Sequence, residues 1–120
     1  MDLNQLRNIY EGKRVFITGH SGFKGVWLTK VLLKCGAIVF GYSNPNYLSA
    51  EDFNNVQFQS FKGDIRDQSI LEAEMKKFKP HMIFHLAAQP IVTRSYQDPI
   101  DTFSTNIMGS AHLLESVRRC

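Results

Sequence analysis

Residues 14–25 read Arg14-Val15-Phe16-Ile17-Thr18-Gly19-His20-Ser21-Gly22-Phe23-Lys24-Gly25, so that a short apolar segment runs directly into three evenly spaced glycines. The apolar segment is typical of a strand buried inside a parallel sheet. Glycines let phosphates approach the backbone without meeting Cβ atoms, and a helix that begins there offers unpaired N–H groups to an anion. A glycine triplet alone is a weak signal, but one placed between a strand and a helix predicts a dinucleotide pyrophosphate site. The residues predicted to form it are Gly19, His20, Ser21, Gly22, Phe23, Lys24 and Gly25.

The rest of the chain alternates between strand and helix patterns. Apolar runs predict strands at 14–18, 37–42, 56–61 and 81–88, separated after the second by an aperiodic loop at 47–55. Helical spacing predicts helices at 23–35, from a cap at Asp67 or Ser69 to Pro80, and from Asp98-Pro99 almost to the last residue. The last helix carries an apolar stripe of Ile100, Phe103, Ile107, Ala111, Leu114 and Val117. This order predicts a Rossmann-like α/β fold in one domain, 1–120: a partial doubly wound parallel sheet of about four strands with three helices and right-handed crossovers.

Composition and charge exclude several classes of protein. The 120 residues are 43% hydrophobic and include 14 basic and 11 acidic side chains, a formal net charge of +3. No long basic run suits a nucleic-acid backbone, no apolar run approaches the roughly 20 residues that cross a bilayer, and the first residues lack a signal-peptide pattern. Cys35 and Cys120 form neither a metal-ligand spacing nor a disulfide framework. We therefore expect a soluble, cytoplasmic protein that binds neither nucleic acid, membrane nor metal.

Two further segments should meet the glycine segment at the carboxyl ends of the strands, where doubly wound sheets bind ligands. After the third strand, the carboxylate of Asp64 could accept from an adenine amino group while Ile65 covers the ring; a polar turn beside a helix cap is the alternative. After the fourth strand, small residues would let the backbone approach the nicotinamide half of a cofactor; tight packing against a helix is the alternative. The second segment consists of Leu86, Ala87, Ala88 and Gln89.

The end of the second strand bears on the choice of dinucleotide. A carboxylate about twenty residues beyond the first glycine usually binds the ribose hydroxyls of NAD, and an arginine there suits the extra phosphate of NADP. This chain has Tyr42, Ser43 and Asn44 instead, whose hydroxyl and amide groups could bind a ribose. Because no Lys or Arg is near, the sequence favours NAD, held in part by Ser43 and Asn44.

The remaining polar residues form no catalytic pattern. The histidines lack metal-ligand spacing, and His85 is expected to be a hydrogen-bonded residue at a strand end rather than a catalyst. Asn106 is a poor helix former inside the last helix. We expect it to tie that helix to a neighbouring loop rather than to touch a substrate. No residue of this chain is predicted to be catalytic.

In this order the motifs resemble the N-terminal part of an extended short-chain dehydrogenase/reductase, over nearly the whole chain. The matching segments are Thr18-Gly19-x-x-Gly22-x-x-Gly25, Gly63-Asp64-Ile65-Arg66-Asp67, His85-Leu86-Ala87-Ala88-Gln89-Pro90 and Thr105-Asn106-Ile107-Met108-Gly109. Within the family, the residues between the glycines and the segment Gln89-Pro90-Ile91-Val92-x-Arg94-Ser95-Tyr96-x-Asp98-Pro99 are most similar to the branch of CDP-glucose 4,6-dehydratases.

The resemblance implies a lyase of polysaccharide biosynthesis that converts CDP-glucose to CDP-4-keto-6-deoxyglucose. It implies that NAD takes a hydride from C4 of the sugar and returns it to C6 after water is lost. The oxidation requires a tyrosine, a lysine four residues later, and a serine or threonine that orients the substrate hydroxyl.

The chain departs from this pattern at the tyrosine–lysine pair. Four positions beyond the tyrosines at 10, 42, 47 and 96 stand Arg14, Asn46, Glu51 and Ile100, so none is followed by the lysine. We therefore expect the pair and the substrate domain to belong to a longer parent protein, and expect these 120 residues alone to be inactive. The alternatives are an epimerase or reductase of the same family acting on another nucleotide sugar, and a non-catalytic dinucleotide-binding module.

The fourth predicted strand bears on association. It is apolar from 82 to 84, and no further strand in this sequence can pair with its outer edge. Open apolar edges recruit other chains. The sequence therefore predicts a homo-oligomer.

Overall fold

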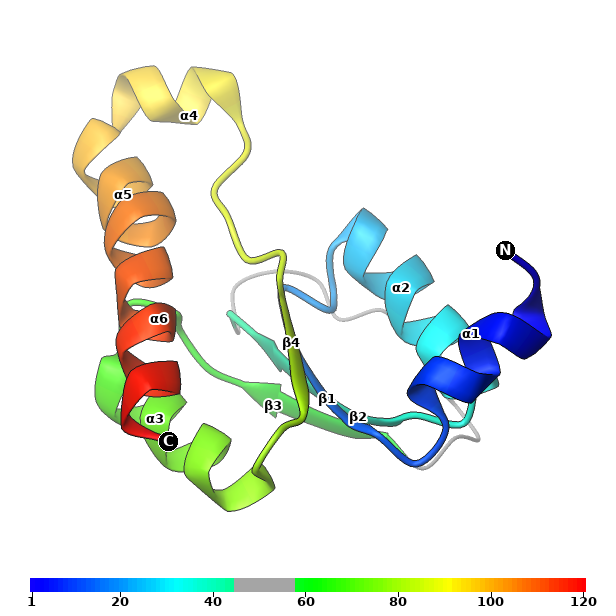
Figure 1. Ribbon diagram of the computed structural model, residues 1–120. Coiled ribbons are helices and arrows are strands. Elements are labelled where there is room, and N and C mark those ends of the chain that lie inside the picture. Colours follow the sequence, from blue (N-terminus) through cyan, green and yellow to red (C-terminus); the bar gives the residue numbers. More distant parts are fainter. Residues whose placement is uncertain (45–57) are drawn as a thin grey trace.

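A computed structural model describes residues 1–44 and 58–120 (Figure 1). Its centre is a parallel sheet of four strands in the order β3-β2-β1-β4. The strands are β1 (Arg14–Thr18), β2 (Ile38–Ser43), β3 (Gln59–Lys62) and β4 (Met82–His85). The predicted Rossmann-like parallel sheet is confirmed, and β4 lies at one of its edges. The predicted loop at 47–55, and positions 56–57 of the predicted third strand, lie outside the described residues.

The helices include the three that the sequence predicts. They are α1 (Leu3–Tyr10), α2 (Phe23–Lys34), α3 (Gln68–Phe78), α4 (Val92–Gln97), α5 (Pro99–Phe103) and α6 (Gly109–Arg119), with a π-helical turn, η2 (Ser104–Met108), between the last two. Of the two caps considered for α3, Asp67 is the one used, because its side chain accepts from the Ile70 N–H. The short helices α1 and α4 were not predicted. α1 begins with a capping box in which Asp2 and Gln5 bond each other's backbone N–H, a signal that the sequence does contain.

The sheet has a separate hydrophobic core on each face because side chains of a strand alternate between the faces. Figure 1 shows α2 over one face, and α3 with α6 over the other. The core under α3 and α6 contains Phe16, Phe40, Tyr42, Ile65, Leu71, Met75 and Leu113. The core under α2 contains Val15, Ile17, Leu32, Ala37 and Val39. Every residue of β1 after Arg14 is buried, so the core holds in place the end of the strand from which the glycine loop begins.

The last three helical segments, α5, η2 and α6, follow one another and carry the predicted apolar stripe on their outer surface. The face turned inward uses Gly109, Leu113 and Ser116, all of which are buried. The stripe itself is exposed: Ile100 by 74%, Phe103 by 57%, Ile107 by 58%, Leu114 by 69% and Val117 by 45%. The regularly spaced apolar residues therefore lie on the solvent-facing side of these segments. The contact of α6 with α3 and with the β3–α3 turn is made by its buried residues.

Candidate functional site

The glycine loop after β1 assigns a different steric role to each of its three glycines. Gly19 has a φ of 74°, and a Cβ there would lie 2.6 Å from the backbone nitrogen of Ala87. A Cβ on Gly25 would overlap the Gly19 carbonyl oxygen. A Cβ on Gly22, in contrast, would meet only that same oxygen, at 3.4 Å. Gly19 and Gly25 therefore serve the turn and the close helix–loop packing, and Gly22 is the one whose bare backbone faces open space.

α2 begins at this open side of the loop, and the N–H groups of a helix's first turn have no partner within the helix. Gly22 is the N-cap and has no side chain to accept from them, and no acidic residue stands in the first turn. Lys24 stands there instead, exposed. A cation at this end of a helix opposes the helix dipole, so a bound anion would satisfy both the N–H groups and the lysine. The loop thus fits a phosphate-bearing group.

The side chain of His20 connects the glycine loop to β2 and β3. His20 is 4% exposed, and its ring fits against Gly41, where any Cβ would overlap it. Nδ1 lies 2.7 Å from Ser43 Oγ, and Nε2 lies 2.7 Å from Ser60 Oγ. Ser43 Oγ also accepts from the hydroxyl of Ser21 at 3.0 Å. Both ring nitrogens are thus used inside the protein, and burial lowers the pKa of His20 so that the neutral ring is favoured.

Asp64 lies in the turn after β3 with its carboxylate held by Arg66. The guanidinium donates to Oδ1 from Nε at 3.0 Å and to Oδ2 from Nη2 at 2.6 Å. The Arg66 side chain is the main cause that holds the pKa of Asp64 below its usual range, so the carboxylate is ionised. The neighbouring Ile65 is 4% exposed and packs in the core against Gly109. Its predicted contact with an adenine ring stays a prediction.

At the end of β4, a hydrogen-bonded chain fixes the backbone that follows His85. Thr18 Oγ1 accepts from the N–H groups of Leu86 at 3.2 Å and Ala87 at 3.3 Å, and lies 2.6 Å from His85 Nδ1. His85 Nε2 lies 3.0 Å from Ser110 Oγ on α6. The prediction that His85 is a hydrogen-bonded strand-end residue is confirmed.

Asn106 and Gln89 join the π-helical turn to the loop after β4. Asn106 Oδ1 accepts from the Gln89 N–H at 2.7 Å, and Asn106 Nδ2 donates to the Gln89 carbonyl at 3.1 Å. The Gln89 side chain is buried and bonds Ile91 and Thr102. The prediction that Asn106 ties the helix to a loop is confirmed, and the side chain of Gln89 serves the same purpose.

The predicted site residues form two groups at the carboxyl ends of the four strands. One group is exposed or half-buried and could contact a ligand: Gly19, Ser21, Gly22, Phe23, Lys24, Asn44, Asp64, Leu86, Ala87 and Ala88. The other is buried and holds the first in place: His20, Gly25, Ser43, Ile65 and Gln89. Sequence reasoning missed Thr18, Ser60 and Asp101, which hold this edge together. Thr18 meets His85 across 67 positions, Ser60 meets His20 across 40 and Asp101 meets Arg66 across 35, and no local pattern marks such pairs.

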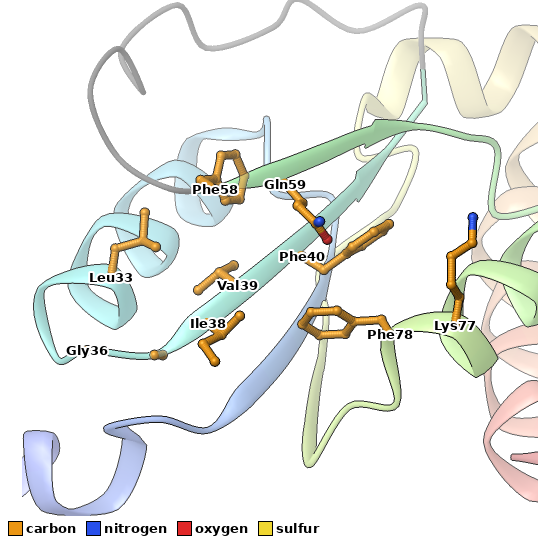
Figure 2. Close-up of a pocket in the computed structure, with 10 residues that line it drawn as sticks. Leu33, Gly36, Ile38, Val39, Phe40, Phe58, Gln59, Lys77 and Phe78 are labelled. Carbon is orange, nitrogen blue, oxygen red and sulfur yellow. The ribbon is translucent and has the colours of Figure 1, made fainter.

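A pocket away from the carboxyl edge is a poor match for a dinucleotide. A pocket of about 900 Å³ lies at the opposite end of the sheet, beside the first residues of β2 and β3 (Figure 2). Its lining includes Ile38, Phe58 and Phe78, with Lys77 as its one charged side chain, so it lacks the polar groups that a dinucleotide requires. Within residues 1–44 and 58–120, no cluster of three or more His, Cys, Asp or Glu side chains could hold a metal ion. No helix in those ranges has the length and apolar character to span a membrane.

Comparison with known proteins identifies the family. A family model described as GDP-mannose 4,6 dehydratase matches residues 16–120. The chain belongs to this family, within the extended short-chain dehydrogenase/reductases. CDP-glucose 4,6-dehydratase of Salmonella typhimurium is 48% identical over 118 residues, covering 94% of this chain and 33% of that protein. UDP-glucose 4-epimerase of Mycolicibacterium smegmatis is 38% identical, over 88% of this chain and 34% of that protein.

Solved structures of the family have the same fold. The epimerase Mth375 of Methanothermobacter thermautotrophicus matches 98% of this chain and 35% of its own, with a TM-score of 0.85 and 31% identity. UDP-glucose 4-epimerase of Thermus thermophilus, solved in complex with NAD, matches 88% of this chain and 34% of its own, with a TM-score of 0.80 and 32% identity. The chain spans about a third of the length of these relatives.

Proposed function

We propose that these 120 residues are the NAD-binding part of a sugar-nucleotide 4,6-dehydratase whose substrate is CDP-glucose. The observation that carries the cofactor assignment is the open backbone at Gly22 beside an uncapped helix N-terminus. The 48% identity to a CDP-glucose 4,6-dehydratase supports the reaction and the sugar nucleotide. The relatives also include a UDP-glucose 4-epimerase at 38% identity, so an epimerase or reductase is the second candidate for the whole protein.

Each segment at the carboxyl edge has a defined task in this proposal. The backbone at Gly22 and the N–H groups of α2 bind the pyrophosphate, with Lys24 adding a positive charge. Asp64 accepts from the adenine amino group. The backbone after β4, held by Thr18, borders the nicotinamide ribose. When bound, NAD supplies the hydride acceptor and donor, whereas this chain contributes binding and orientation.

The end of β2 supports NAD rather than NADP. The Ser43 hydroxyl is committed to Ser21 and His20, so we assign the adenosine ribose to Asn44. Residues 42–46 include no lysine or arginine that could pair with an added phosphate. NADP is therefore expected to bind at least about tenfold more weakly than NAD, a loss of about 1.4 kcal/mol in binding free energy.

Titration calorimetry with NAD tests the cofactor assignment. Gly22→Ala is expected to keep the fold, because the added Cβ meets only one atom at 3.4 Å, and to abolish binding because the methyl group occupies the place of the phosphate. Lys24→Ala is expected to weaken binding, and Lys34→Ala, at the other end of the same helix, is its control. NAD binding that is equally strong in the wild type and Gly22→Ala would contradict the proposal.

A turnover assay tests the assignment of catalysis to a longer protein. Because none of the four tyrosines has a lysine four positions later, the 120-residue chain with NAD and CDP-glucose is expected to form no 4-keto-6-deoxy product. The complete enzyme is expected to form it. If the chain binds NAD and the complete protein has no turnover with any nucleotide sugar, a non-catalytic binding module is the better description.

A further inference from the structure

The turn after β3 contains a guanidinium that fixes the direction of the Asp64 carboxylate. Arg66 donates to Oδ1 from its backbone N–H at 2.9 Å and to Oδ2 from Nη2 at 2.6 Å, and its Nε–H is shared between Oδ1 at 3.0 Å and Oδ2 at 3.1 Å. An ionised carboxylate accepts about four hydrogen bonds, two on each oxygen. Arg66 thus contacts both carboxylate oxygens, and it fixes the plane of the carboxylate. Oδ2 also accepts from the amide of Asn44 at 3.4 Å, the longest of the contacts to this carboxylate and longer than an ordinary N–H···O bond.

Arg66 is itself held by α5, through the carboxylate of Asp101. Its Nη1 lies 2.6 Å from Oδ1 of Asp101, whose carboxylate side chain is only 14% exposed. Oδ2 of Asp101 accepts from Arg94 on α4 at 3.0 Å. Asp101 is fixed at the start of α5, because its N–H donates to the capping carboxylate of Asp98. The chain of ion pairs therefore joins Asp64, in the turn after β3, to α4 and α5.

From this geometry we infer that Arg66 is a positioning residue for nucleobase recognition: anchored by Asp101, it aims Asp64 Oδ2 at the amino group of the cofactor's adenine. The inference rests on the proposed function, since it assumes a dinucleotide at the carboxyl edge. A planar, bidentate guanidinium restricts both carboxylate oxygens at once, which the point charge of a lysine cannot do. Arg66 needs no contact with the ligand to act in this way.

The test compares NAD with nicotinamide hypoxanthine dinucleotide, which presents a carbonyl oxygen where adenine presents its amino group. The wild type is expected to bind NAD about tenfold more tightly. Arg66→Ala is expected to reduce this ratio to nearly one by weakening NAD alone, and Arg66→Lys and Asp101→Asn to give intermediate ratios. Arg118→Ala, which removes an exposed pair with Glu115 on α6, is the matched control and is expected to keep the wild-type ratio.

The outcomes separate this inference from the cofactor assignment. If Arg66→Ala weakens both dinucleotides equally or leaves the ratio unchanged, the role of Arg66 is structural and the inference is wrong, although NAD binding stands. If the wild type binds both dinucleotides equally, Asp64 does not read the amino group and the inference is also wrong. If the wild type binds neither, the proposed function fails and the inference with it. If Arg66→Ala does not fold, Asp101→Asn takes its place: a lowered ratio of NAD affinity to hypoxanthine-dinucleotide affinity supports the inference, and the wild-type ratio contradicts it.

Discussion

Thr18 and His85 face each other at the carboxyl ends of β1 and β4, where a hydrogen bond of 2.6 Å joins Thr18 Oγ1 to His85 Nδ1. The same hydroxyl accepts from the N–H groups of Leu86 and Ala87, so its single proton is left to be donated to the imidazole. Nδ1 is then an acceptor, and Nε2 carries the proton that can be donated to Ser110 Oγ. This arrangement requires a neutral His85, in agreement with burial, which lowers its pKa.

Thr18→Val is expected to lower the free energy of unfolding by about 1–3 kcal/mol, because the Ala87 N–H and an imidazole nitrogen lose their shared partner, while the Leu86 N–H keeps the Thr18 carbonyl at 2.9 Å. Thr29→Val is a matched control, since Thr29 is equally buried and its hydroxyl donates only to the Gly25 carbonyl one helical turn earlier. Urea unfolding of the two variants measures the difference. Equal losses of unfolding free energy in both variants would show that the Thr18 hydroxyl contributes no more to stability than the single hydrogen bond of Thr29.

Stability is expected to fall as the pH drops from about 7.5 to about 5.5. Burial lowers the pKa of His20 and His85 in the folded protein, so the unfolded chain takes up protons first. The stabilisation is therefore complete above the ordinary histidine pKa of about 6.5 and is lost as the pH falls through the lowered values. Asp64 and Glu115 have lowered carboxyl pKa values and titrate below this range.

Thermal unfolding across this pH range measures the effect. His85→Asn offers Thr18 an acceptor that cannot be protonated, so the variant is expected to show a shallower dependence of the unfolding temperature on pH. His112→Asn, which changes a histidine of α6 that bonds neither Thr18 nor His85, is the control and is expected to keep the wild-type slope. A wild-type unfolding temperature that does not change with pH would contradict the neutral assignment.

Local sequence patterns were sufficient to locate the four strands and the glycine loop, although β4 ends at His85 and not at 88 as predicted. Val15 and Ile17 alternate with Phe16 between two cores, and the apolar run that encodes this is continuous in the chain. The positions of Gly19 and Gly25 were equally readable, because the two glycines lie only six residues apart in one short motif. Predictions of this kind depend on residues that are neighbours in sequence.

The polar bonds that hold the carboxyl edge could not be read in this way. His20 and Ser60 are 40 positions apart, and Arg66 and Asp101 are 35 positions apart. Their meeting depends on strand order and on the direction of the last helix, which a pattern of residue types does not contain. The apolar stripe shows the same limit: the period identified a face of the last helix, but not that this face is exposed.

Gly25→Ala is expected to lower the free energy of unfolding by at least about 2 kcal/mol, because the new methyl group would overlap the Gly19 carbonyl oxygen and neither backbone segment can move away cheaply. Gly22→Ala is the matched control, since it adds the same methyl group to the same loop with one contact at 3.4 Å. Chemical denaturation of both variants measures the two losses in the free energy of unfolding, and only Gly25→Ala is expected to show a large one. A Gly25→Ala variant as stable as the wild type would mean that the loop and α2 are not packed as described.

The exposed stripe on α5, η2 and α6 is expected to drive self-association. Large apolar side chains at 45–74% exposure on one helical face favour burial against a second copy. Leu114→Lys, in the middle of α6, is therefore expected to shift the protein toward the monomer in sedimentation velocity experiments. Val92→Lys is its control, because Val92 on α4 is 67% exposed, close to the 69% of Leu114, and lies outside the stripe. If both variants associate as strongly as the wild type, the stripe is not the contact, and the open edge of β4 is the surface to test next.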